Sequence, residues 1–294
     1  MVDHPNRFAW YELLTTDTAA AKAFYSNVLG WQACDASTPE FGYDLFTTQD
    51  CPVTGLMELP EQGRRQGATP RWVGYVAVEN VEAAAERLKR LGGTVYVPPT
   101  RTNIGRIAIV ADPQTAPFAL IGEPTIAGVS LQAAGPEAHA PGRVGWHELL
   151  AADGAKAFGF YHELFGWERS NAGHGPVQSY HAFAVDGRTI GGMFTKLAGT
   201  PFSFWLYYFD VPDMAHALAR LKAARGQVLQ GPSALPDGSW IVRCTDPQGA
   251  MFALQGPSSE AIEEQAPKLG WSAEWGGFAS KGRVVVKPPA KPKR

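Results

Sequence analysis

Two stretches that repeat each other decide the fold of this chain. Residues 7–32 read RFAWYELLTTDTAAAKAFYSNVLGWQ, and residues 143–168 read RVGWHELLAADGAKAFGFYHELFGWE. At one constant offset, the first tryptophans, the glutamates two residues later and the closing Gly-Trp pairs all coincide. Because self-similarity over tens of residues marks a repeat architecture, the halves are predicted to share one fold.

A second pair of stretches extends the repeat through each half. Residues 72–93 (WVGYVAVENVEAAAERLKRLGG) parallel residues 205–226 (WLYYFDVPDMAHALARLKAARG), and residues 111–122 (ADPQTAPFALIG) parallel residues 245–256 (TDPQGAMFALQG). The Ala/Gly/Pro stretch Ala133–Gly142 has the composition of a linker. The predicted organisation is a first domain at 1–132, a linker at 133–142, a second domain at 143–257 and a C-terminal extension at 258–294.

Each half also divides into two similar units. The alternating strand Phe8–Thr15 leads into a helix that Asp17 caps and Gly30 ends, and short strands follow it. A strand at Trp72–Val78, a helix at Val81–Leu91 and three further strands repeat this order. The order β-α-β-β-β is therefore predicted four times, twice in each half, giving an α+β fold.

Composition narrows the function of the 294-residue chain. Its hydrophobic content of 45% supports a sizeable core, and its net charge of −2 argues against a generally basic nucleic-acid binder. The sequence shows neither a membrane-length apolar run nor an export signal, and its three cysteines form no CxxC pair. We expect a cytoplasmic monomer or homodimer that binds a small molecule, with no nucleic-acid or membrane partner.

The four units resemble the vicinal oxygen chelate superfamily, also called the glyoxalase/bleomycin-resistance/dioxygenase superfamily. The motif FYxxxLGW and its variant at Asp17–Trp31 and Asp153–Trp167 carry this resemblance, together with DPQxAxFAL at Asp112–Leu120 and Asp246–Leu254. The residues of these motifs are most similar to those of the two-domain, mycobacterial-antigen-like and "hydroxylase"-labelled branch. The resemblance implies that two adjacent units pair their sheets into a curved, ligand-holding cup, one per half.

The resemblance also implies metal ligands at set positions on the strands. The side chains at these positions are Trp10, Val73 and Ala119 in the first half and Trp146, Leu206 and Ala253 in the second. None of them offers a donor that a divalent cation accepts. One further position falls on Glu58 or Met57, and on Met193 or Phe194 in the second half. We therefore expect no metal and no other cofactor; the alternative is a metal-dependent lyase, isomerase or dioxygenase with ligands elsewhere.

Strand alternation predicts which side chains face each cup. Because side chains two residues apart share a face, Glu12 and Glu148 should face the cups with the tryptophans that precede them. Glu12 and Glu148 are the candidate catalytic residues. The candidate ligand-binding residues are Trp10, Tyr75 and Met57 in the first cup and Trp146, Tyr208 and Met193 in the second. The alternatives are that the aromatic residues are plain core and that each glutamate forms a buried ion pair, for instance with Arg7 or Arg143.

The two cups are not expected to be equivalent. Gly74 aligns with Tyr207 and Val73 with Leu206, so the second cup should be tighter and a small aromatic ligand should prefer the first. His147 should be a hydrogen-bonded core residue on the helix side. The basic, Pro-rich end from Lys281 is typical of a solubilising tail.

Overall fold

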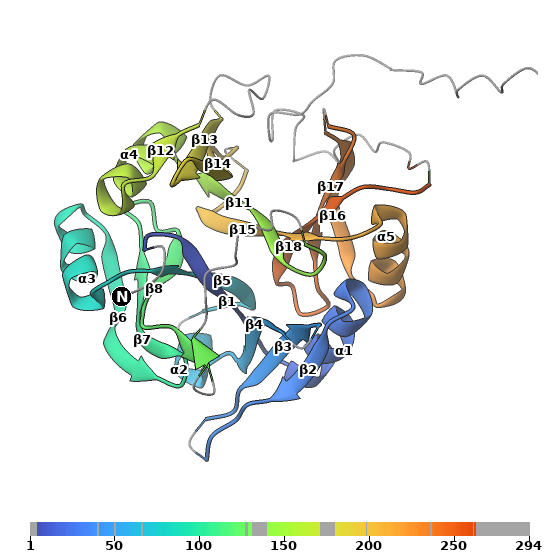
Figure 1. The fold of residues 1–294 in the computed structure, drawn as a ribbon, viewed down its shortest axis with the longest axis horizontal. Coiled ribbons are helices and arrows are strands. Elements are labelled where there is room, and N and C mark those ends of the chain that lie inside the picture. The colour runs from blue at the N-terminus through green and yellow to red at the C-terminus, as the bar shows by residue number, and fades with distance from the viewer. Residues whose placement is uncertain are drawn as a thin grey trace, which may run out of the picture.

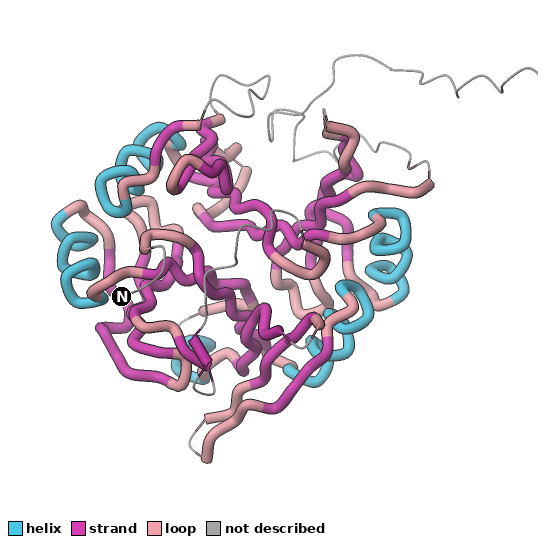
Figure 2. The backbone as a smooth tube through the Cα atoms, viewed as in Figure 1, coloured by secondary structure: helices cyan, strands magenta, loops and turns pink. Residues whose placement is uncertain are grey.

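Two eight-stranded sheets and four main helices form the described part of the chain (Figure 1). The computed structural model describes residues 5–39, 41–49, 51–65, 67–126, 129–130, 140–170, 180–197, 199–235, 237–260 and 262. Most of the linker, His174 and the basic tail therefore lie outside the described residues. Figure 2 shows how strands dominate the interior of the molecule while helices lie towards its sides.

The first sheet has the strand order β2-β3-β4-β1-β5-β8-β7-β6. Its elements are β1 (Phe8–Thr15), α1 (Thr18–Leu29), β2 (Gln32–Asp35), β3 (Asp44–Thr48), β4 (Cys51–Glu58), α2 (Glu61–Arg65), β5 (Arg71–Ala77), α3 (Val81–Arg90), β6 (Thr94–Thr102), β7 (Gly105–Ala111) and β8 (Pro117–Gly122). The antiparallel pair β1–β5 joins the two units at the centre of the sheet.

The second sheet repeats this topology as β12-β13-β14-β11-β15-β18-β17-β16. Its elements are β11 (Val144–Ala151), α4 (Gly154–Phe165), β12 (Glu168–Arg169), β13 (His181–Val185), β14 (Arg188–Thr195), β15 (Phe204–Asp210), α5 (Met214–Ala223), β16 (Gln227–Ala234), β17 (Trp240–Thr245) and β18 (Met251–Gly256). The prediction of four β-α-β-β-β units and an α+β fold is confirmed. The five-residue α2 and the short hairpin of β9 (Thr125–Ile126) and β10 (Val129–Ser130) were not predicted, because such short elements carry no periodicity.

The predicted caps fix the ends of the first helix of each half. The Asp17 carboxylate accepts the backbone N–H of Ala20 at 2.9 Å, and Gly30 ends α1 at φ 73°, where a side chain would be strained. Asp153 and Gly166 act in the same way on α4. Both helices therefore begin and end where the sequence repeat places them.

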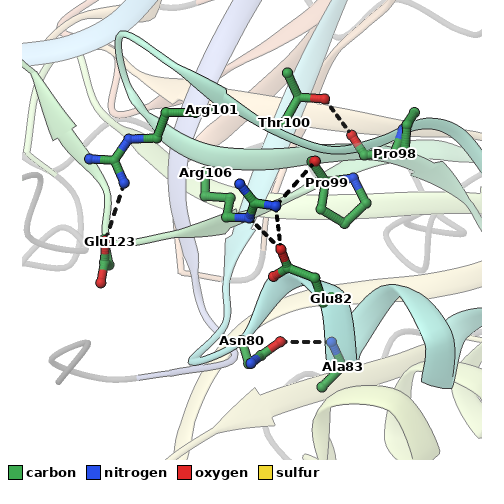
Figure 3. Close-up of polar contacts among 9 residues, drawn as sticks. All are labelled: Asn80, Glu82, Ala83, Pro98, Pro99, Thr100, Arg101, Arg106 and Glu123. Atoms are coloured by element: carbon green, nitrogen blue, oxygen red, sulfur yellow. Dashed lines mark hydrogen bonds and ion pairs between the residues drawn. The ribbon is translucent and has the colours of Figure 1, made fainter.

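Polar contacts hold the hairpin β6–β7 against α3 (Figure 3). Asn80 caps α3 by accepting the backbone N–H of Ala83 at 2.8 Å. Arg106, on β7, forms an ion pair with Glu82 in the first turn of α3 and also donates to the carbonyl of Pro99. These contacts fix β7 against α3, and the side chains that alternate with Arg106 lie on the opposite face of the sheet.

The helix-bearing faces of the two sheets share one hydrophobic core. Helix α1 lies beside α5 and α3 beside α4, so each pair brings together both halves (Figure 1). The Tyr25 hydroxyl donates to Asp246 at 3.1 Å, and the Tyr161 hydroxyl donates to Asp112 at 3.3 Å. The two Asp residues belong to the repeated DPQ turns, so each half supplies the same contact to the other.

The opposite face of each sheet turns away from the helices and forms the inside of a curved cup. Trp10 and Leu14 of β1 lie on this face, whereas Leu13 lies in the shared core, as alternation predicts. A bulge between Phe8 and Trp10 interrupts the alternation and turns Phe8 towards the core. We call the two cup faces the first cup and the second cup. Within the described residues, no helix is long and apolar enough to cross a membrane.

Candidate functional site

One row of side chains crosses the centre of the first cup. Strand register places Trp10 opposite Tyr75, Tyr75 opposite Ala119, and Ala119 opposite Ile109. Trp10, Tyr75 and Ala119 are each no more than 3% exposed and belong to one cluster with Val73. Strands β1, β5, β8 and β7 therefore present a continuous aromatic and aliphatic wall to the cup.

Glu12 is the polar centre of this wall. Its side chain is buried, with the residue only 3% exposed. The Tyr43 hydroxyl donates to Oε1 at 2.6 Å and the Tyr75 hydroxyl donates to Oε2, while Trp10 Nε1 donates to the Tyr43 hydroxyl at 3.0 Å. Burial raises the pKa of Glu12 above its ordinary value, and the hydrogen bonds from Tyr43, Tyr75 and Trp10 only partly oppose this shift. The carboxyl group therefore keeps its proton to a higher pH than an exposed glutamate does.

A glycine on β4 makes room for this arrangement. Gly55 lies opposite Glu12 in the parallel pair β1–β4. A Cβ at Gly55 would lie 2.0 Å from the Tyr43 hydroxyl oxygen, so only glycine lets the Tyr43 ring pass over β4 to reach Glu12. In the second cup, Gly192 lies opposite Glu148 and gives the same room to Tyr180.

The second cup repeats the wall but contains an additional cation. Arg243 Nη2 donates to Glu148 Oε2 at 2.5 Å, and its Nε donates to the Tyr208 hydroxyl at 3.0 Å. Arg243 Nη1 donates to Gln230 Oε1 at 2.5 Å, and the Tyr208 hydroxyl donates to Glu148 at 2.6 Å. Burial by itself lowers the pKa of Arg243, but the Glu148 carboxylate and the Tyr208 hydroxyl together outweigh burial and raise it. Arg243 therefore remains charged and holds Glu148 in a buried ion pair.

The structure separates the two candidate methionines. Met57 of β4 lies half-buried against the first-cup cluster, on the expected face. The expected location of Met193 in the second cup is wrong, because Met193 belongs to the shared core between the sheets. Phe194 takes the cup position and packs with Leu150, since the register Leu150–Phe194 matches Leu14–Met57.

The alternative reading of the glutamates as buried ion pairs holds for one cup. Glu148 forms an ion pair, but with Arg243 rather than with Arg7 or Arg143. Arg7 instead contacts Asp186 at 2.8 Å. Glu12 has no ion pair with any residue that the structure describes. The carboxylate of Glu148 is therefore neutralised by a cation, whereas the equivalent Glu12 has no ion-pair partner among the described residues.

Two further expectations concern residues on the helix side. His147 is a buried core histidine, as predicted: its Nδ1 contacts the Ile190 carbonyl at 2.7 Å, and burial lowers its pKa to about 4. The expectation that Tyr207 narrows the second cup is wrong. Tyr207 points into the shared core, where its hydroxyl accepts the N–H of Gly74 at 2.8 Å.

The residues present do not fit the divalent metal that the resemblance implies. Trp10, Val73 and Ala119 stand at the expected ligand positions and face the first cup, but none has a suitable donor atom. Glu58, the remaining carboxylate candidate, is exposed and contacts Arg64 at 3.4 Å. Within the described parts of the chain, no cluster of three or more His, Cys, Asp and Glu side chains could hold a metal ion.

Sequence reasoning missed Tyr43, Tyr180 and Arg243. The first two carried a signal, because each precedes its aligned glycine, Gly55 or Gly192, by the same spacing in both repeats. Arg243 carried none, because it lies on the last antiparallel strand pair, far in sequence from Glu148. Only the order of the strands across the curved sheet brings the two together.

Known proteins with related sequences cover most of the chain. CFP32 of Mycobacterium bovis, whose name gives a provisional assignment as a glyoxylase, is 30% identical over 255 residues, spanning 85% of this chain and 95% of that protein. The anthracycline biosynthesis protein DauV of Streptomyces sp. strain C5 is 29% identical over 267 residues, spanning 85% and 93%.

Solved structures share the fold at low sequence identity. The Mn(II)-bound glyoxalase from Novosphingobium aromaticivorans has a TM-score of 0.60 at 16% identity, covering 89% of this chain and 84% of that one. A 4-hydroxymandelate synthase variant from Streptomyces coelicolor has a TM-score of 0.59 at 12% identity, covering 89% and 95%. The model of one family matches both repeats, at residues 7–119 and 143–254. The chain therefore belongs to the Glyoxalase/Bleomycin resistance protein/Dioxygenase superfamily.

Proposed function

We propose that the chain binds a small hydrophobic or aromatic molecule in the first cup, without a metal ion at the usual ligand positions of its superfamily. The observation that carries this proposal is the buried Glu12 carboxyl group, which two phenols hold within an aromatic and aliphatic wall. An apolar site with a few convergent polar groups suits a small molecule with one polar handle.

Glu12 gives this site a capacity for proton transfer. Because burial raises its pKa, the carboxyl group can give or take a proton at a higher pH than an exposed glutamate can. A ligand hydroxyl, carbonyl or basic nitrogen beside Glu12 is the partner that such a group would serve. Two relatives named for anthracycline biosynthesis support a fused-ring aromatic ligand.

Titration with 1,4-dihydroxyanthraquinone, a neutral planar probe, tests this function. We expect saturable quenching of protein fluorescence that is reduced in Trp10→Phe, because Trp10 lies in the wall of the first cup. Treatment with EDTA should leave the affinity unchanged within about twofold, since the ligand positions carry no metal donors.

The control is Trp240→Phe, which changes a tryptophan on β17 of the second sheet and should leave the quenching in place. Absence of saturable binding by this probe would contradict a neutral fused-ring ligand in the first cup. Loss of binding on chelation, restored by Mn²⁺ or Fe²⁺, would instead favour the metal-dependent lyase or dioxygenase alternative.

A further inference from the structure

The two cups differ at two neighbouring positions of the same row. In both cups the row begins with a tryptophan, a tyrosine and an alanine on the central strands. In the first cup it continues with Ile109 on β7 and Val97 on β6. At the equivalent register, the second cup has Arg243 and Gln230. The polar pair of one repeat is therefore an apolar pair in the other, while the Glu and Tyr side chains that the polar pair contacts are retained.

The second cup shows which group this Glu–Tyr pair accepts. The Arg243 guanidinium bonds both the Glu148 carboxylate, at 2.5 Å, and the Tyr208 hydroxyl, at 3.0 Å. The side chains of Arg243 and Glu148 are 5% and 4% exposed, so the cation is almost fully desolvated. A buried carboxylate is far less costly when such a cation lies beside it.

The first cup has the same acceptors with no cation among the described residues. Glu12 and Tyr75 correspond to Glu148 and Tyr208, and they contact each other in the same way. The hydrogen-bond donors around Glu12 are neutral: the phenols of Tyr43 and Tyr75 and the indole of Trp10. At the position of the guanidinium-bearing residue stands Ile109, which is only half-buried.

Two apolar positions beside the row are more exposed in the first cup than in the second, although Trp10 is more buried than its counterpart Trp146. Leu14 and Met57 are half-buried, whereas their counterparts Leu150 and Phe194 are 0% and 3% exposed. Phe41, 38% exposed, stacks on Tyr43 at a ring-centroid distance of 6.0 Å. These partly exposed apolar side chains offer contact area to the body of a ligand whose polar group reaches Glu12.

We propose that the ligand of the first cup carries a protonated planar nitrogen group, an amidinium or a guanidinium, joined to an aromatic or apolar body. The cation takes the place that Arg243 holds in the second cup and bonds Glu12 and Tyr75. This proposal rests on the binding function proposed above and specifies that the polar group of the ligand is positively charged.

Benzamidine and benzamide form a matched pair for the test, because they share a ring and a planar head group but only benzamidine is charged. At about pH 8, we expect benzamidine to bind the full-length protein at least about tenfold more tightly than benzamide, as measured by calorimetry. The preference should weaken as the pH falls and Glu12 takes up a proton. The titratable groups facing Glu12 are Tyr43 and Tyr75, and both stay neutral because burial raises their pKa values well above 10.

Two substitutions test whether the preference for benzamidine over benzamide arises at Glu12. Glu12→Gln removes the negative charge, and Ile109→Arg supplies an internal guanidinium; each should reduce the preference for benzamidine to about twofold or less. Glu123→Gln, the same change at an exposed carboxylate that contacts Arg101, is the control and should retain it (Figure 3). If Glu12→Gln does not fold, Ile109→Arg carries the test.

Equal binding of benzamidine and benzamide, or a preference that survives both substitutions, would overturn the proposed ligand class. If dihydroxyanthraquinone still binds in that case, the proposed function stands and only the charge of the handle is wrong. If neither that probe nor benzamidine binds, both proposals fail.

Discussion

Glu12 and Glu148 occupy equivalent positions, but their neighbours give the two carboxyl groups different electrostatic roles. Arg243 neutralises Glu148, so removing either partner would leave the other as a buried charge without a counter-ion. Glu12 is held by phenols, and burial raises its pKa. The Glu12 carboxyl group is therefore protonated more easily than an exposed glutamate.

Isosteric substitutions of the two glutamates should lower the free energy of unfolding by different amounts. Glu148→Gln leaves the Arg243 cation buried without an anion, so we expect a loss of about 3–5 kcal/mol in the free energy of unfolding. Glu12→Gln should cost less and show a distinct pH dependence. Because the pKa of Glu12 is raised in the fold, its contribution is complete below the unfolded value of about 4.3 and is lost as pH rises through the folded value.

Relative to the parent protein, Glu12→Gln should therefore become more stable as pH rises above about 4.3. Denaturant unfolding between about pH 4 and about pH 8 measures this trend. A pH-independent difference for Glu12→Gln, or a cost equal to that of Glu148→Gln, would contradict the contrast between the cups.

At the scale of elements, strand β4 positions the site because a glycine, which has no side chain, lies opposite Glu12. Gly55 gives the Tyr43 ring its path to Glu12, and the register of β1 with β4 places the glycine directly opposite the glutamate. The same device recurs on β14 with Gly192 and Tyr180. A strand interior normally disfavours glycine, so the packing of the tyrosine is the physical reason for this residue.

Gly55→Ala should displace Tyr43 from Glu12. The new Cβ would lie 2.0 Å from the Tyr43 hydroxyl oxygen, so we expect a destabilisation of about 2–4 kcal/mol and a loss of binding in the first cup. In a Tyr43→Ala background, the same change should cost under about 1 kcal/mol, because the obstructing ring is gone. Additive effects of the two substitutions, measured by denaturant unfolding, would show that Gly55 and Tyr43 are not coupled.

At the scale of the whole molecule, the two halves are joined through the core that lies between their sheets. Tyr25 donates to Asp246 of the other half, and Trp72 Nε1 donates in turn to the Tyr25 hydroxyl at 3.0 Å. Tyr161, Asp112 and Trp205 make the equivalent chain in the opposite direction. Because these buried contacts connect the halves reciprocally, neither half keeps its core intact without the other.

We therefore expect the protein to unfold as one cooperative unit. Tyr25→Phe removes the hydroxyl and leaves Asp246 and Trp72 each short of a buried partner, which should cost about 1–3 kcal/mol. Differential scanning calorimetry should show a single transition at a lower Tm. Two resolved transitions, with only the first-half transition shifted by Tyr25→Phe, would show that the halves are energetically independent.

The sequence by itself determined the repeat, the four β-α-β-β-β units and the faces of the central strands. Periodicity and caps are local, so Asp17, Gly30 and the alternation around Trp10 and Glu12 could be interpreted without any long-range contact. The same local reasoning failed for Met193, because the register of β14 against β11, rather than proximity to an aligned position, decides which face it takes.

Only the tertiary structure decided the chemical character of each cup. Arg243 reaches Glu148 across β15 and β18, and Tyr43 reaches Glu12 across β4, so both contacts depend on strand order and on the space that a glycine leaves. Likewise, Tyr207 bonds Gly74 across the two halves instead of narrowing a cup. Charge neutralisation and desolvation depend on distances of a few ångströms between segments far apart in the chain, and local sequence patterns do not encode those distances.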